Sequence, residues 1–585
     1  MPDRRMLRSS RVGVEVFISR TLSGMEHRKH LFILLRWTSG YLRAGMRFLL
    51  LPAVFYFCGF AILTWPLLPR FSTHFFADTG DGFQNVWNLW WVNKSLTQLH
   101  QSPWHTTFLH FPYGTSLLGH LLTPFNGLMA ILLLPLIPLV EAHNVIVIFA
   151  FVSSGITALW LSYYLTRSYP SSLIAGAIFT FSNYHFMHAQ GHLQLVSFEW
   201  LPLFVFAWYL LMTKPSVWVG VVTGVVLFAV ILCDYYAAFD SILAAGLITV
   251  WYAIRERDVR FLFRRSHRLA VVSFAIVFSF TTAPLCIALL RANASDPMGG
   301  HPSDIFSADL LSPFIPGTHW RFAQLTHPFW SRLPGDINET SVHVGLAVIS
   351  LLVFTWWRRH RLASSPALWY AMLLSFYILS LGPVLHVFGR PFSFVKLPYH
   401  LLEIVFPPVN VSGVPIRMMV MVQLSAAVIS AFGFEMLFKR PGVMRWFAVT
   451  LLLVTSVEYL PAPLPSTFAA VPSYVEFVKM LPDEHGLLDL ADDGYAALYY
   501  QTVHEKQLAF GFTSRTPTSV QQHDQQLIST IQRGEWQEVY CQYHIRYVIA
   551  DDSAAQQPHP AGQTIYDAGH IKVYDLEPSN VCSTH

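Results

Sequence analysis

The chain has 585 residues, of which 53% are hydrophobic and only 12% are charged, whereas soluble domains usually carry about a quarter of charged residues. This composition excludes an ordinary soluble enzyme and is typical of an integral membrane protein. The net charge of +4 does not indicate a nucleic-acid partner, because the basic residues fall in short clusters between apolar runs, as the positive-inside rule expects.

The N-terminal arm, residues 1–47, is rich in arginine and has no long apolar core. No cleavable signal is therefore predicted, and the first span is expected to act as an uncleaved anchor. Because Arg36, Arg43 and Arg47 precede that span, the arm is expected in the cytoplasm.

Apolar runs of about 17 to 26 residues, long enough to cross roughly 30 Å of hydrocarbon, predict about eleven membrane spans. They lie near residues 48–68, 143–165, 171–188, 194–213, 216–234, 237–254, 269–290, 341–357, 366–388, 413–438 and 443–461.

One further run, 120–140, contains Pro124, Pro135 and Pro138, and interior prolines interrupt helical hydrogen bonding. If this run does not cross, the later basic loops all face the cytoplasm, and if it crosses they all face outward. We therefore interpret it as a re-entrant or interface helix, which protein must cover. The alternative is an ordinary span together with a second span elsewhere in the chain that the apolar runs do not reveal.

This topology predicts an all-α polytopic membrane domain at 48–462, with a long first outer loop at 69–142. Residues 463–585 are predicted to form a small extracytoplasmic α/β domain, because β-rich segments at 486–490, 547–550 and 570–574 alternate with polar helical stretches. Cys541 and Cys582 of this domain could pair in an oxidising compartment. The sequence does not decide whether they meet.

The first outer loop carries two carboxylates three residues apart, Asp78 and Asp81. Neighbouring glycines predict a turn, so both side chains are expected to converge just above the membrane as an acid–base or metal-binding pair. The alternative is an Asx-turn and helix N-cap, for which Asp81 is well placed. Three tryptophans are expected to anchor the following helix at the membrane interface: Trp87, Trp90 and Trp91.

A second outer cluster contains His185, His188 and His192. Three close histidines can bind a metal, but no cysteine and no H-E-x-x-H motif accompanies them, so hydrogen bonding at the interface is favoured. Another outer turn, with Asp234 and Asp240, is expected to line the same cavity.

Arg417 lies at the outer end of a predicted span. A guanidinium group can hold two phosphate oxygens, whereas snorkelling to the membrane surface is the alternative. Nucleotide chemistry is not indicated, because the sequence has no Walker loop and no glycine-rich dinucleotide fingerprint.

These features together resemble the GT-C membrane glycosyltransferases, and among them the bacterial proteins related to aminoarabinose and mannosyl transferases. The likeness covers most of residues 45–460 as architecture. Its residue support is Asp78 and Asp81, Trp87 to Trp91, Tyr113 and Gly114, His192 to Leu195, Glu339, and Pro415 to Arg417.

The resemblance implies that Asp78 or Asp81 is the catalytic base, that the donor is a sugar on a polyprenyl phosphate, and that Arg417 holds the phosphate. Further substrate contacts are expected from Glu339, Arg321, His74 and Trp87. It implies a hexosyl- or pentosyltransferase of the bacterial inner membrane, surrounded by membrane lipids, acting on a glycan, lipid or protein acceptor. Metal ligands are not identified, and metal dependence, on a divalent ion, stays open.

Two other functions compete with this interpretation. A transporter or flippase of lipid-linked glycans would need polar groups along the spans, and these are scarce. A non-catalytic membrane scaffold would use its outer domain to bind a partner, and it should tolerate replacement of both aspartates.

Overall fold

The computed structural model describes residues 42–336, 339–440, 442–492, 494–553, 558–577 and 582. Most of the predicted cytoplasmic arm lies outside the described residues. The chain divides into one unit that ends at Phe55, within the first apolar helix, and a second unit that begins at Tyr56.

Four helices among the described residues are long and apolar enough to cross a membrane. They are Leu42–Leu63, which includes α2 (Leu51–Leu63), then α5 (Leu139–Thr166), α11 (Tyr235–Glu256) and Pro415–Phe438, which includes α19 (Met419–Phe438). A bent pair that meets at 46° adds a fifth candidate: α12 (Arg265–Phe280) and α13 (Thr282–Ser295).

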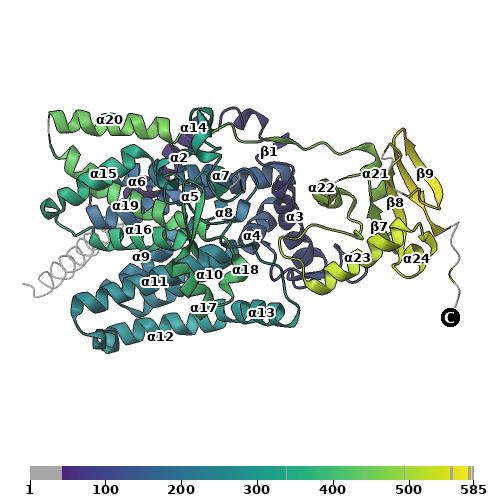
Figure 1. Ribbon diagram of the computed structural model, residues 1–585, viewed down its shortest axis with the longest axis horizontal. Helices are drawn as coiled ribbons and strands as arrows, with labels where there is room; N and C mark the ends of the chain where they lie inside the picture. Colours follow the sequence, from purple (N-terminus) through teal and green to yellow (C-terminus); the bar gives the residue numbers. More distant parts are fainter. Residues whose placement is uncertain are drawn as a thin grey trace, which may run out of the picture. The chain divides into compact units, whose positions relative to one another are not determined.

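The remaining helices before the C-terminal region are shorter (Figure 1). Those that are also strongly apolar are α4 (Pro124–Leu133), α9 (Trp200–Thr213), α10 (Val217–Cys233), α15 (Leu346–Trp357) and α16 (Ala367–Ser380). The others are α3 (Asp81–Asn93), α6 (Tyr169–Thr180), α7 (Asn183–His188), α8 (Leu193–Val196), α14 (Ala323–Trp330), α17 (Pro398–Val405), α18 (Val409–Ser412) and α20 (Val443–Glu458).

The predicted count of eleven spans is not confirmed, because several apolar runs continue past the helix ends. Run 171–188 is divided between α6 and α7, and run 366–388 ends in a hairpin of β4 (Val384–Val387) and β5 (Arg390–Lys396). Hydropathy reports whether side chains are apolar but does not distinguish a helix from a turn. It therefore overestimates helix length where turns are also apolar.

Run 120–140 contains the short helix α4, which packs against α3 and α5. Pro124 occupies its first turn, where a missing N–H costs nothing, and a turn at residues 134–138 separates it from α5. At 1.5 Å per residue the helix is about 15 Å long, half of what a span requires.

Helix α19 lies at the centre of the helical region and packs against α5, α6, α15 and α16. Its interior sequence is rich in alanine, serine and glycine, and small side chains let helices approach closely. A Cβ atom at Gly433, for example, would lie 2.5 Å from Thr355 Oγ1. The tight packing of α19 gives a rigid support to the short helical turn Pro415–Met418 that precedes it and carries Arg417.

The C-terminal region forms a four-stranded sheet in the order β7-β8-β10-β9, with β7 and β8 parallel and the other pairs antiparallel. The strands are β7 (Gly486–Asp489), β8 (Ile545–Asp551), β9 (Gln563–Ala568) and β10 (Ile571–Asp575). Its helices are α21 (Ser473–Lys479), α22 (Gly494–His504), α23 (Thr518–Gln532) and α24 (Trp536–Cys541). All three predicted β-rich segments lie on strands of this sheet.

A disulfide joins Cys541, at the end of α24, to Cys582 near the C-terminus. The sequence had left this pairing open, because 41 residues separate the two cysteines. The bond ties the end of the chain to the sheet domain.

The first outer loop takes part in two short strand pairs. One pair lies within the loop, and the other joins the loop to the C-terminal region. The strands are β1 (His74–Phe75), which pairs with β6 (Thr467–Phe468), and β2 (His105–Thr106), which pairs with β3 (Thr115–Ser116). Segments distant in sequence are thus held beside each other.

The C-terminal domain packs on α3 through α22 (Figure 1). Trp87 on α3 is fully buried, stacks on Trp91 and donates an Nε1–H hydrogen bond to Gln501 Oε1 at 2.6 Å. Trp90 is buried in the same cluster, together with Leu487 and other side chains of the sheet domain. The tryptophans are therefore core residues between the two domains, rather than exposed anchors at a membrane interface.

Candidate active site

Asp78 holds the turn that starts α3. Its Oδ1 accepts hydrogen bonds from the N–H groups of Gly80 at 3.1 Å and Gly82 at 3.0 Å. Gly80 occupies the N-cap position of α3, so Asp78, and not Asp81, supplies the side-chain oxygen that binds N–H groups at the start of this helix. Gly191 lies against the same carboxylate, because a Cβ atom there would be 2.7 Å from Oδ1. Asp78 also donates its backbone N–H to Gln190 O at 2.7 Å.

Asp81 is the first residue of α3, and its side chain points to His192. Oδ2 lies 2.8 Å from His192 Nε2, and 34% of the Asp81 side chain is exposed. A carboxylate in this position is held by one partner and is still open to a second, such as a hydroxyl group.

The pKa values of the two carboxyl groups are shifted in opposite directions. Burial, helped by the charge of Asp81, raises the pKa of Asp78. Burial also opposes ionisation of Asp81, but the hydrogen bond and charge of His192, followed by the charge of Arg417, lower the pKa of Asp81 below its ordinary value. Asp81 therefore ionises at lower pH than Asp78. It also has fewer hydrogen-bond partners, because Asp78 already accepts two backbone N–H groups.

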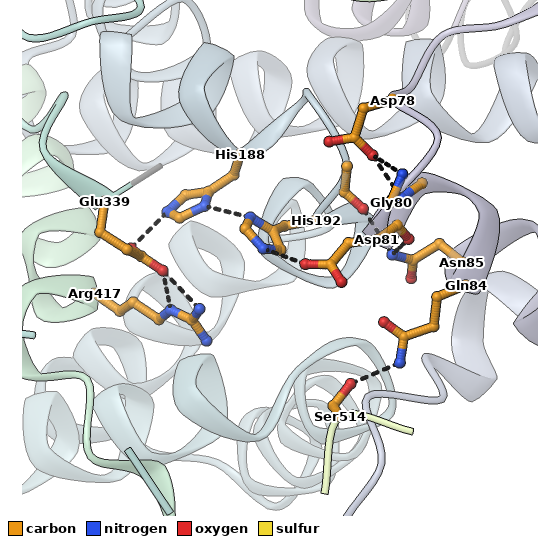
Figure 2. Close-up of polar contacts among 12 residues, drawn as sticks. Asp78, Gly80, Asp81, Gln84, Asn85, His188, His192, Glu339, Arg417 and Ser514 are labelled. Atoms are coloured by element: carbon orange, nitrogen blue, oxygen red, sulfur yellow. Dashed lines mark hydrogen bonds and ion pairs between the residues drawn. The ribbon is translucent and has the colours of Figure 1, made fainter. Parts of the chain in front are cut away.

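From Asp81, a row of ionisable side chains continues to Arg417 (Figure 2). His192 Nδ1 lies 3.4 Å from His188 Nδ1, and His188 Nε2 lies 3.8 Å from Glu339 Oε2. Glu339 Oε1 accepts hydrogen bonds from Arg417 Nε at 2.9 Å and Nη2 at 2.6 Å.

The row contains a gap in its hydrogen bonding. His188 is fully buried, which favours a neutral imidazole with one N–H group. If that proton lies on Nδ1 and points to His192, then His188 Nε2 and Glu339 Oε2 face each other as two acceptors. Within the described residues neither atom has a hydrogen-bond partner.

Arg417 is held on three sides. Its side chain is 8% exposed and pairs with Glu339, of which 4% is exposed. The guanidinium carbon lies 4.6 Å from the centre of the Tyr236 ring, a cation–π contact. The backbone oxygen of Arg417 accepts a hydrogen bond from Tyr184 Oη at 3.0 Å.

A small cavity of about 10 Å³ adjoins Arg417, enough for roughly one water molecule. It is lined by residues from four segments: Tyr184, Gln194, Asp234, Tyr236, Asp240 and Arg417, with apolar neighbours. Gln194 Oε1 and Asp234 Oδ2 are buried and have no hydrogen-bond partner among the described residues. The histidine segment and the Asp234 turn therefore line one cavity.

His120 connects this region to the C-terminal domain. Its Nδ1 accepts hydrogen bonds from Gln84 Nε2 and from the Ser514 N–H, each at 3.1 Å, and its Nε2 lies 2.8 Å from Asn88 Oδ1. Burial lowers the pKa of His120 to about 3, so the ring is neutral and Nε2 carries the proton. Gln84 Nε2 also donates to Ser514 Oγ at 2.7 Å (Figure 2).

The structure does not bring all predicted substrate residues to this row. His74 lies on β1, where its ring packs on Phe468 and its Nδ1 lies 2.9 Å from Thr73 Oγ1. Arg321 is exposed, and its backbone N–H donates to Leu460 O. Trp87 is buried with its polar atom already bonded. Asp81, Glu339 and Arg417 lie along the row, whereas the Asp78 carboxylate binds the N–H groups of the adjoining turn.

Residues that the sequence did not assign to the site are His192 as partner of Asp81, Tyr236, and Ser514 of the C-terminal domain. The histidine cluster was visible, but its role depends on a distant carboxylate. For metal binding, the described residues contain no group of three or more His, Cys, Asp or Glu side chains arranged to hold an ion.

Replacing His192 by glutamine is expected to raise the pKa of Asp81, because burial, which opposes ionisation of Asp81, remains while the lowering effect of His192 is lost. If Asp81 is the base, the acid limb of the kcat/KM profile should move to higher pH. The profile of transfer against pH measures this, with His105→Gln, on an exposed residue of the same loop, as control. If the acid limb does not move, His192 does not control the ionisation of the catalytic base.

No protein-family model matches the sequence, and no curated protein matches it significantly. Among solved structures, it is similar to the arabinofuranosyltransferase AftD from mycobacteria, a GT-C enzyme, with a TM-score of 0.53 and 13% identity, over 91% of this chain and 40% of AftD. The chain thus spans about 40% of the length of that enzyme. A mutant of AftD gives a TM-score of 0.54 at 13% identity, over 91% and 41% of the two chains.

ArnT from Cupriavidus metallidurans, a GT-C enzyme solved with undecaprenyl phosphate, is also similar, with a TM-score of 0.47 and 12% identity, over 89% of this chain and 98% of ArnT. The likeness to AftD shows that the described chain has the GT-C fold. The family resemblance predicted from the sequence is confirmed at this level.

Proposed function

We propose that this protein, whose fold is that of GT-C enzymes, is a membrane glycosyltransferase. It would transfer a sugar from a polyprenyl-phosphate donor to an acceptor hydroxyl group. The observation that carries this proposal is the row from Asp81 to Arg417. An ionised, partly exposed carboxylate lies at one end and a buried guanidinium group lies at the other.

The two ends of the row match the two requirements of the reaction. A phosphate leaving group needs positive charge, whereas the attacking hydroxyl group must lose a proton. Asp81 would accept that proton on a carboxylate oxygen while His192 orients the carboxylate and favours its ionised form. Arg417 would stabilise the phosphate. Attack of the acceptor oxygen on the anomeric carbon, from the face opposite the phosphate, would form the new glycosidic bond with inversion while the bond from that carbon to the phosphate oxygen breaks and polyprenyl phosphate leaves.

Asp78 has a supporting role in this scheme. Its Oδ1 is occupied by two backbone N–H groups, and these fix the turn from which Asp81 projects. We therefore assign the base to Asp81 and the positioning of its turn to Asp78. The sequence alone had left the two residues equivalent.

We further propose a bacterial plasma-membrane location, with the arm at 1–47 in the cytoplasm and the domain at 463–585 outside. The disulfide between Cys541 and Cys582 supports the outer placement, because disulfides persist mainly in oxidising compartments. The active site, which contacts that domain through Ser514, would then face the same side.

The proposal is tested by analysing lipids that co-purify with the protein in nanodiscs by mass spectrometry. Wild type should retain a polyprenyl-phosphate species, and Arg417→Ala should lose most of it. Arg321→Ala removes an exposed arginine of the second predicted outer loop, residues 291–340, and serves as matched control, with size-exclusion profiles confirming that each variant is folded. If neither wild type nor the variants carry such a lipid, the scaffold alternative gains weight.

A further inference from the structure

A loop of the C-terminal domain, residues 511–517, and the first turn of α23 contact the outer segments of the membrane domain. Ser514 contacts Gln84 and His120 of the first outer loop. Further along, the Thr518 N–H donates to Pro297 O at 3.1 Å, and Ser519 N–H donates to Asp296 Oδ1 at 3.1 Å, both on the second outer loop. These contacts hold the chain on both sides of residues 515–517, a segment that begins with Arg515.

Arg515 and Arg417 contact the same aromatic side chain. Arg515 Nη2 lies 3.5 Å from Tyr236 Oη, and the Arg417 guanidinium group lies over the Tyr236 ring. Arg515 Nη1 donates to Ser514 O at 2.8 Å, which orients the side chain along its own loop. Two guanidinium groups from different domains thus contact the same tyrosine side chain, one at its hydroxyl group and one over its ring.

The charges of the region explain why a second cation matters. Glu339 is bonded to Arg417 and compensates its charge, so Arg417 alone offers an incoming anion little net attraction. Arg515 adds a positive charge on the Tyr236 side. Both cations also act on His301. Burial, followed by the charges of Arg515 and Arg417, lowers the pKa of His301 to about 4.

We propose that Arg515 of the C-terminal domain binds the phosphate group of the donor together with Arg417. The C-terminal domain would then be part of the active site and complete its anion-binding side. This inference rests on the proposed function. It adds that the donor phosphate is recognised from two domains, and that Tyr236 spaces the two guanidinium groups.

Binding of farnesyl phosphate and of inorganic pyrophosphate to the protein in nanodiscs tests this inference without requiring turnover. Arg515→Gln should weaken binding of farnesyl phosphate roughly tenfold or more, because a charge-assisted hydrogen bond is lost. Arg515→Lys should retain part of the affinity and its salt dependence. Arg533→Gln, on an exposed residue of the same domain paired with Glu535, should bind like wild type.

The outcomes separate this inference from the proposed function. If Arg417→Ala weakens binding of farnesyl phosphate while Arg515→Gln leaves it unchanged, the role of Arg515 is refuted and the lipid-phosphate site stands. If Arg515→Gln and Arg533→Gln weaken binding equally, the effect is structural and the inference also fails. Arg515-dependent binding of pyrophosphate alone would support an anion site but refute its assignment to a lipid donor.

Discussion

Replacing Asp81 by asparagine is expected to lower kcat for sugar transfer by roughly 10²- to 10⁴-fold, the range typical of a lost general base. An asparagine side chain keeps an acceptor oxygen for His192 but cannot take a proton from the acceptor hydroxyl group. Because 34% of the Asp81 side chain is exposed and α3 begins there without depending on its charge, the fold should persist.

Asp78→Asn is the matched control for this experiment. The asparagine Oδ1 can still accept the hydrogen bonds from Gly80 and Gly82, so the turn and most of the activity should remain. Single-turnover rates for both variants measure the chemical step directly. Loss of transfer in Asp78→Asn with normal transfer in Asp81→Asn would exchange the two roles, and normal transfer in both would leave the scaffold interpretation.

The general architecture could be predicted from the sequence because long apolar runs, basic loops and alternating β segments are local signals. The strands β7, β8 and β10 all fall where the residue pattern predicts β-rich segments. The number of spans could not be obtained in this way. Helices such as α6 end inside apolar runs, at turns that only tertiary packing specifies.

The site divides along the same line. Asp78 and Asp81 could be found because two carboxylates and two glycines share one short turn. Their separate roles could not, since these depend on His192 and on backbone contacts to Gln190. The approach of Ser514 to Gln84 joins residues 430 positions apart, and no local pattern encodes such a contact.

Glu339→Ala is expected to reduce the free energy of unfolding by about 3–5 kcal/mol, because it leaves the buried Arg417 without its partner. Arg417→Met should cost less, since a buried carboxylate can become protonated whereas a guanidinium group does not lose its charge. Thermal and denaturant unfolding in detergent would measure both, and Arg533→Met, which removes an ion pair with Glu535 that is exposed on both sides, serves as control.

The double variant Glu339→Ala/Arg417→Met distinguishes packing from electrostatics. If the penalty in Glu339→Ala comes from an uncompensated charge, removing that charge should restore most of the lost stability, and the two changes should couple strongly. Additive losses would instead indicate that each side chain contributes through packing alone. In either case the double variant should remain without transfer activity, because the buried pair can be replaced structurally while the phosphate still needs a cation.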